Sequence, residues 1–248
     1  MSRIRVATFN IRNGLGLDGR NIWPLRRATT ARTIAALEAD VVALQEVYGF
    51  QQTYLERHLD HLFVAAGRVD GVKGERCPVL VDTAFAEVTD TRHVWFGTTP
   101  HRPGTKLPGA NFPRIATMAR LAAGPDRRPI DVWSTHLDEA SAERRRTSAQ
   151  QLVDALDPSV PNVVMGDLNA DPGSDVLAVF EDGGLSLVEP AGTTGTEHRF
   201  TGRTDGRRID HILVSEHFTV VDARVGTARL GRSLASDHFP VCAIVDLR

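Results

Sequence analysis

Residues 162–169, Asn162-Val163-Val164-Met165-Gly166-Asp167-Leu168-Asn169, join a short apolar run directly to two polar side chains. The β-branched run predicts a buried strand over Asn162–Met165. The strand ends at Gly166, and Asp167 and Asn169 follow at once. A rigid strand end can hold a carboxylate and an amide with the accuracy that catalysis needs.

The same arrangement recurs along the whole chain. Asn10 follows the predicted strand Ile4–Phe9, Glu46 follows Val41–Leu44, His136 and Asp138 follow Ile130–Ser134, Asp210 lies inside the apolar segment Arg208–Val214, and Asp237-His238 precedes Val241–Val245. Six strand ends that deliver Asn, Asp, Glu and His predict one site on the rim of a sheet sandwich.

The remaining pattern predicts many strands and few helices. Further strands are expected at Leu62–Ala65, Pro78–Val81, Glu87–Val94, Ile115–Leu121 and Val220–Val225, and helices at about Pro24–Leu37, Gln51–Leu59, Ala142–Leu156 (capped by Ser141 or Asp138) and after Ser174. Such a mixture indicates an α/β or α+β protein with large sheets. The even spread of strands favours a single domain over residues 1–248.

Each candidate residue alone has an ordinary structural explanation. Asn10 can cap a turn, Glu46 can be a solvated strand end, and both His136 and His238 can be core histidines. Asp167 and Asn169 favour turns through local hydrogen bonds. Asp210 is harder to explain in this way, because a carboxylate among apolar residues must be paired or ligated. The coincidence of all six strand ends favours a functional site.

The residue types also select the chemistry. Glu46, Asn10, Asp237 and Asp167 offer only oxygen atoms, which suits Mg²⁺ or Mn²⁺. A zinc site requires several His or Cys ligands at short spacing, and none is present. The sequence has no P-loop, no Gly-x-Gly-x-x-Gly and no Gly-x-Ser-x-Gly. Water is therefore the expected nucleophile.

Composition limits the possible partners. The 29 basic and 31 acidic residues of the 248-residue chain give a net charge of −2, which provides no overall attraction for nucleic acid or anionic membrane. Aromatic residues make up 6%, so base-stacking platforms are few. No apolar run reaches the roughly 20 residues that span a bilayer, and the N-terminus shows no signal region. We expect a cytoplasmic protein without membrane insertion, and no protein partner is predicted.

Taken in order, the polar motifs resemble the signatures of the endonuclease/exonuclease/phosphatase superfamily, which has the deoxyribonuclease-I-like fold. The matching segments are Thr8-Phe9-Asn10-Ile11-Arg12, Leu44-Gln45-Glu46-Val47, Gly74-Glu75-Arg76, Asn111-Phe112-Pro113-Arg114, Ser134-Thr135-His136-Leu137-Asp138, Gly166-Asp167-Leu168-Asn169, Arg208-Ile209-Asp210-His211 and Ser236-Asp237-His238-Phe239-Pro240. The resemblance covers nearly the whole chain. It implies a four-layer sandwich of two packed mixed β-sheets flanked by helices.

The resemblance also implies a role for each residue. Glu46 would be the main metal ligand, with Asn10 and Asp237 beside it. Asp167 would activate water, and Asn169, His136, His238 and Arg114 would contact the phosphate. Asp210 would support His238 and Glu75 would support His136, so that both histidines favour their protonated forms.

The expected reaction is in-line attack of activated water on a phosphate ester. Asp167 and the Asp210–His238 pair are both candidates for the general base, and one or two metal ions are both compatible with the sequence. A small or modest-sized ester is the favoured substrate, and the alternative is a nuclease acting on DNA or RNA. His211 is interpreted as a packing residue and His198 as a solvated loop residue, with a role in the site as the alternative for each.

Overall fold

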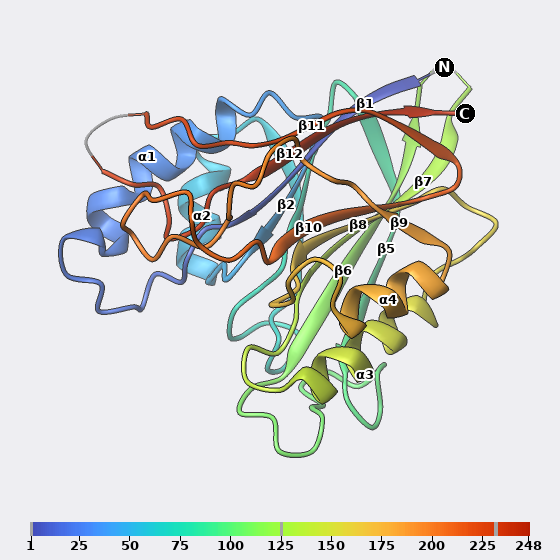
Figure 1. The fold of residues 1–248 in the computed structure, drawn as a ribbon, viewed down its shortest axis with the longest axis horizontal. Coiled ribbons are helices and arrows are strands. Elements are labelled where there is room, and N and C mark those ends of the chain that lie inside the picture. Colours follow the sequence, from blue (N-terminus) through green and yellow to red (C-terminus); the bar gives the residue numbers. More distant parts are fainter. Residues whose placement is uncertain (1, 125, 231–232) are drawn as a thin grey trace.

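The computed structural model describes residues 2–124, 126–230 and 233–248, which form two six-stranded sheets (Figure 1). The first sheet has the order β11 (Phe218–Val225), β12 (Val241–Leu247), β1 (Ser2–Asn10), β2 (Val41–Gln45), β4 (Val79–Asp82) and β3 (His61–Val64). The second has the order β5 (Ala86–Phe96), β6 (Arg114–Ala123), β7 (Arg128–His136), β8 (Asn162–Asp167), β10 (Asp210–Ser215) and β9 (Leu185–Leu187). Both sheets are mixed, because β1 and β2 run parallel in the first and β7 and β8 in the second.

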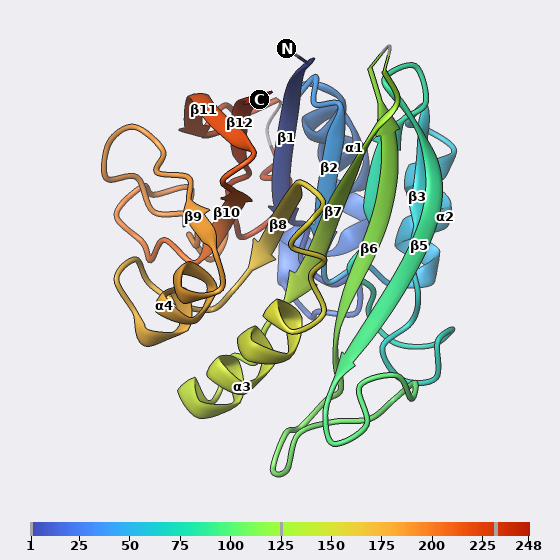
Figure 2. The same cartoon turned by 90° about the vertical axis from the view of Figure 1, so that its right-hand side faces the viewer.

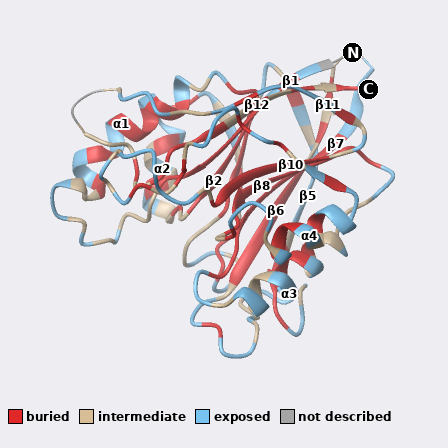
Figure 3. Ribbon diagram, viewed as in Figure 1, coloured by how far each residue is buried: buried red, intermediate tan, exposed pale blue. Residues whose placement is uncertain are grey.

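The two sheets pack face to face, and helices cover their outer faces. Aliphatic side chains from both sheets form the central core, among them Val6, Val132 and Val163. Helices α1 (Trp23–Ala35) and α2 (Gly49–Glu56) pack on the first sheet, and α3 (Ala142–Val153) and α4 (Asp175–Asp182) on the second. Figure 2 shows the two helical pairs on opposite sides, and Figure 3 shows the buried strands between them. The predicted four-layer sandwich is confirmed.

Local sequence accounts for several of these elements. Every residue of β2 and of β8 is buried, as expected for β-branched strands covered on both faces. Helix α1 has proline in its first turn, where the missing N–H costs no hydrogen bond. Of the two predicted caps of α3, Ser141 is the N-cap, and its side chain accepts the N–H of Arg144 at 3.2 Å.

Strand register sets the positions of the polar strand ends. On the second sheet His136 pairs with Asp167 across β7 and β8, and Asp167 pairs with Asp210 across β8 and β10. These three residues therefore stand in one row across neighbouring strands. On the first sheet Asn10 pairs with Gln45, so Glu46 follows immediately beyond the same row. The register brings the polar ends of five strands to one edge of the sandwich.

Two findings add to the sequence predictions. Strand β9 is only three residues long and was not expected, and its pairing with β10 through Leu187 and Leu213 makes it the edge of the second sheet. None of the helices in the described residues has the length and apolar character needed to cross a membrane.

Candidate active site

A cleft of about 300 Å³ opens at the edge where the polar strand ends meet. Eight of the predicted site residues line it: Glu46, Glu75, Arg114, His136, Asp167, Asn169, Asp237 and His238. The other two, Asn10 and Asp210, are buried behind the cleft and contact residues that line it. Seven further residues complete the lining: Arg12, Asn13, Arg68, Phe112, Glu139, Glu197 and Ile209.

Asp167 lies at the centre of the polar network. Its carboxylate accepts the side-chain N–H of Asn10 at 3.0 Å and the backbone N–H of Asn169 at 3.0 Å. Its Oδ2 atom lies 3.5 Å from Nε2 of His136 and 4.0 Å from Nε2 of His238. Burial and the charge of Asp210 raise the pKa of Asp167 to about 7. A carboxyl group with this pKa can exchange a proton at neutral pH.

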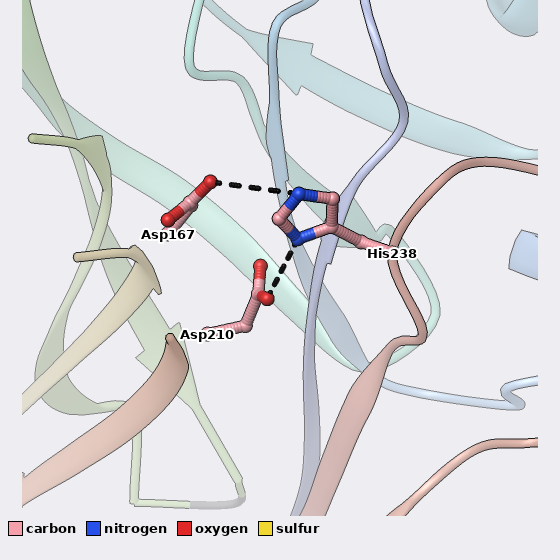
Figure 4. Close-up of side chains that lie close together, drawn as sticks. All are labelled: Asp167, Asp210 and His238. Carbon is pink, nitrogen blue, oxygen red and sulfur yellow. Dashed lines mark hydrogen bonds and ion pairs between the residues drawn. The ribbon is translucent and has the colours of Figure 1, made fainter. Parts of the chain in front are cut away.

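Asp210 and His238 form a buried pair next to Asp167 (Figure 4). Oδ2 of Asp210 lies 2.8 Å from Nδ1 of His238, as the family resemblance implied. Burial alone would lower the pKa of His238, but the charge and hydrogen bond of Asp210 raise it well above its usual value. His238 is therefore an imidazolium that turns its Nε2–H toward Asp167.

Among the described residues, these three also form a cluster whose geometry could hold a metal ion. Their ligand atoms all lie within 4.8 Å of one another. Nδ1 of His238 already contacts Asp210, so a carboxylate orients the imidazole whose Nε2 faces Asp167. This arrangement can also act as a proton-transfer unit.

His136 differs from His238. Burial and the nearby charge of Arg114 lower its pKa well below the usual value, so the ring is neutral. Its Nε2 atom lies 3.1 Å from Nδ2 of Asn169, which places the imidazole lone pair opposite an amide donor. The expectation that both histidines favour the protonated form is thus wrong for His136.

The partner expected behind His136 is engaged elsewhere. Oε2 of Glu75 forms an ion pair of 2.8 Å with Nη1 of Arg68. Within the described parts of the chain, His136 and Glu75 share no hydrogen bond or ion pair, although both line a small pocket next to the cleft. Glu75, which the family resemblance assigned as the partner of His136, therefore pairs with Arg68 instead.

Glu46 is held by three donors at the end of β2. Oε1 accepts the side-chain N–H of Asn10 at 3.1 Å, and Oε2 accepts the backbone and side-chain N–H groups of Asn13 at 2.8 and 3.0 Å. Burial acts to raise the pKa of Glu46, but neighbouring groups, the hydrogen bonds from Asn10 and Asn13 among them, lower it below its usual value. Glu46 is thus a fixed carboxylate that stays ionised at any working pH.

Three residues at the strand ends have left-handed backbone conformations. The φ angles are 57° at Arg12, 62° at Glu46 and 51° at Asn169. This region is sparsely populated by residues other than glycine, and such strain collects at functional sites. Here it turns the chain sharply after β1, β2 and β8, so that each side chain faces the cleft.

The oxygen atoms of Glu46 and Asp237 fit a hard divalent cation. Burial raises the pKa of Asp237, and the charge of Glu46 adds to that increase. The nearest guanidinium, that of Arg12, lies 3.7 Å from Asp237 and also pairs with Asp18 at 3.0 Å. The carboxylates of Glu46 and Asp237 match the oxygen ligands that Mg²⁺ and Mn²⁺ prefer. The oxygen of Asn10 accepts the N–H of Arg12 at 2.9 Å, while its NH₂ group positions Glu46 and Asp167.

The other predicted residues have mixed outcomes. Arg114 begins β6 and is buried beside the cleft, where it pairs with the half-exposed Glu139. His211 is buried and its Nε2 contacts the carbonyl of Ala170 at 2.8 Å, in agreement with a packing role. His198 was expected to be solvated, but it is 5% exposed. Its ring lies against Phe239, with the ring centroids 4.1 Å apart, because the loop before β10 folds back onto the segment that carries His238.

Sequence reasoning missed Arg68, Phe112, Asn13 and Glu139. These residues come from loops whose sequences show no strand or helix periodicity to place them. Asn13 lies three residues after Asn10, and the proximity of a second amide to a strand end was the only available signal.

Comparison with known proteins gives a consistent result. The sequence model of the Endonuclease/Exonuclease/phosphatase family matches residues 7–238. An endonuclease/exonuclease/phosphatase from Bacteroides vulgatus is 29% identical over 100% of both chains, with a TM-score of 0.92. A mannosyl-6-phosphatase from Bacteroides thetaiotaomicron is 25% identical over 98% of this chain and 100% of that one, with a TM-score of 0.88. The human Nocturnin catalytic domain is 20% identical over 99% of this chain and 95% of that one, with a TM-score of 0.75, and it shares the fold. No curated protein sequence matches the chain.

Proposed function

Because the chain belongs to the endonuclease/exonuclease/phosphatase family, we propose that it is a divalent-metal-dependent phosphoesterase with residues 1–248 as one catalytic domain. Its substrate is a small or modest-sized phosphate ester. The observation that best supports this function is the Asp210–His238–Asp167 arrangement, because it combines an imidazolium and a carboxyl group of pKa about 7 in one cleft. The similarity to a mannosyl-6-phosphatase supports a small ester as the substrate.

The carboxylates at the ends of the first sheet would hold the metal ion. Glu46 and Asp237 supply the ligand oxygens for Mg²⁺ or Mn²⁺, and Asn10 keeps Glu46 in place. When bound, the ion polarises the phosphoryl oxygens and stabilises the leaving oxygen. A cation beside Glu46 and Asp237 also lowers the cost of keeping both carboxylates ionised.

In the proposed reaction, Asp167 is the proton acceptor and His238 is a hydrogen-bond donor. Ionised Asp167 accepts a proton from water as the water oxygen bonds to phosphorus and the ester P–O bond breaks. His238, held by Asp210, donates a hydrogen bond to the charge that builds up on the phosphoryl group. The leaving alkoxide is protonated by solvent or by Asp167, so the products are an alcohol and a phosphate.

The remaining groups of the cleft bind the phosphoryl oxygens. Asn169 offers its amide N–H, and Arg114 offers a guanidinium next to His136. All three side chains line the cleft beside Asp167. Donors fixed in this way act on the transition state without reorganisation.

Hydrolysis assays on the purified protein would test this function. The panel contains sugar phosphates, nucleoside monophosphates, an aryl phosphodiester, RNA, and plasmid and single-stranded DNA, each with Mg²⁺, Mn²⁺ or EDTA. Asp167→Ala serves as the inactive control. We expect metal-dependent release of phosphate from a small ester and none from the variant.

Each outcome of the panel decides between alternatives. Preferred cleavage of DNA or RNA would replace the small-molecule proposal with a nuclease. Equal activity of wild type and Asp167→Ala would refute the proposed site. A folded protein that binds metal but hydrolyses none of these esters would contradict the proposed substrate class.

A further inference from the structure

Arg68 is a buried cation at the cleft to which the proposed mechanism gives no role. It is 7% exposed and lines the cleft together with Arg114 and His136. Nη1 pairs with Glu75 at 2.8 Å, and the ring of the exposed Phe112 lies over the guanidinium, 4.7 Å from Cζ. Long charged side chains are rarely buried unless an ion pair or a bound ligand offsets their loss of hydration.

The position of Arg68 is fixed by its backbone. Its N–H donates to the carbonyl of Glu75 at 3.0 Å, and its own carbonyl accepts Nε1–H of Trp95 at 3.0 Å. The preceding residue, Gly67, leaves no room for a side chain, because an added Cβ would lie 2.3 Å from the backbone of Val72. The guanidinium is therefore preorganised beside the cleft, and binding an anion would cost it little conformational entropy.

Two guanidinium groups share this side of the cleft. Arg68 and Arg114 both line the small pocket that also contains His136. Burial and the charge of Arg68 lower the pKa of Arg114, and both cations contribute to the lowered pKa of His136. Of their two carboxylate partners, Glu75 is largely buried, whereas Glu139 has 48% of its side chain exposed and can turn away into solvent. When Glu139 turns away, Arg68 and Arg114 together present a net positive charge to a bound ligand.

We propose that Arg68 is a specificity-determining residue that, with Arg114, selects phosphate monoesters over diesters, an inference that rests on the proposed phosphoesterase function. A monoester carries a charge of about −1.5 to −2 near pH 7, because its second pKa is about 6. A diester carries only one negative charge, and its second substituent replaces a charged terminal oxygen. A second guanidinium therefore strengthens binding of the monoester more than binding of the diester.

The test uses two esters with the same leaving group. Wild type and Arg68→Met are assayed at pH 8 on 4-nitrophenyl phosphate and on methyl 4-nitrophenyl phosphate, and the ratio of the two kcat/KM values is compared. We expect the monoester-to-diester ratio to fall about ten- to hundredfold in Arg68→Met, as expected for the loss of a hydrogen bond between charged groups. Arg68→Lys should retain part of the preference for the monoester, because it keeps the positive charge but loses the planar guanidinium and its paired N–H donors.

A double variant separates substrate binding from a structural role. Arg68→Met leaves Glu75 buried without its partner, so Arg68→Met/Glu75→Gln removes the whole ion pair. If Arg68 only neutralises Glu75, the double variant regains the wild-type ratio, and that result would overturn the proposal. If Arg68 contacts the phosphate, the ratio stays low in the double variant.

An ion pair away from the cleft provides the matched control. Arg120 and Asp131 form a charged pair at 2.6 Å on β6 and β7, and neither residue lines the cleft. Arg120→Met/Asp131→Asn should leave the ratio unchanged. A wild-type protein that prefers the diester would contradict the inference alone, whereas a wild type that hydrolyses neither ester with Mg²⁺ or Mn²⁺ would count against the phosphoesterase function itself.

Discussion

The two sides of the cleft are built differently. On the strand side, Asn10, His136, Asp167 and Asp210 stand at strand ends and are at most 7% exposed. On the loop side, Phe112 is 50% exposed and Glu139 has 48% of its side chain exposed, although Arg68 is buried. Sheet register fixes the strand side, whereas the loop side depends on ion pairs and a ring stacked on a guanidinium. Under the proposed function, the strand side performs the chemistry and the loop side selects the ligand.

Substituting the central carboxylate should give the largest effect. Asp167→Asn keeps the shape and removes the proton acceptor, so we expect kcat to fall about a thousandfold, within the range of general-base catalysis. The folded-state pKa of about 7 lies above the usual value of 3.8, so ionisation of Asp167 reduces stability as pH rises toward 7. The variant should therefore unfold at no lower temperature than wild type at pH 8.

The control for that variant is close in sequence. Asp171 pairs with Arg207 at 2.8 Å on the surface and does not line the cleft. Asp171→Asn should keep the wild-type kcat. If Asp167→Asn lost only substrate affinity, with kcat intact, the division between the two sides of the cleft would fail.

A change at the metal carboxylate should have the next largest effect. Glu46→Gln removes the ligand charge while keeping hydrogen-bonding atoms for Asn10 and Asn13. We expect the Mg²⁺ or Mn²⁺ concentration that gives half-maximal activity to rise about ten- to hundredfold, as when a ligand or its direct support is lost. Titration of activity with metal measures this, with the surface variant Glu56→Gln as control. An unchanged metal requirement would exclude Glu46 as a ligand.

Metal binding should also release a proton from the strand side. In the metal-free protein the pKa of Asp167 is about 7, because burial and the charge of Asp210 raise it. At pH 6 the group is therefore mostly protonated, and a cation held next to Glu46 would favour its ionised form. We expect calorimetry in two buffers of different ionisation enthalpy to detect up to one proton released per Mn²⁺ at pH 6 and almost none at pH 8. Asp167→Asn should lack this release, and an equal release from both proteins would contradict the assignment.

The contrast between the two sides also explains what the sequence could predict. The apolar runs that end at Asn10, Glu46, His136 and Asp167 have strand periodicity, and the family resemblance assigned a role to each. The pairing of Asp210 with His238 followed from the same resemblance and is present at 2.8 Å. The residues on the strand side of the cleft could thus be predicted almost completely from the sequence.

The loop side was predicted less well. Arg68 lies in a segment with no periodicity, and its capture of Glu75 depends on a Gly67-based turn that only the folded chain reveals. For the same reason the supposed Glu75–His136 contact was wrong. His198 was assigned to solvent because its loop is polar, whereas tertiary packing on Phe239 buries it. Contacts between loops arise from the whole fold and leave little trace in local sequence.

The smallest predicted effect concerns Glu139, the exposed partner of Arg114. Its carboxylate competes with a bound phosphate for the same guanidinium, and an ion pair with one exposed partner contributes only about 0.2–1 kcal/mol. Glu139→Gln should therefore lower KM for the best monoester by roughly two- to fivefold and leave kcat unchanged. The matched control is Glu143→Gln on the exposed face of α3. A rise in KM would mean that Glu139 helps to orient Arg114, and the loop side would then be a rigid part of the site, as the strand side is.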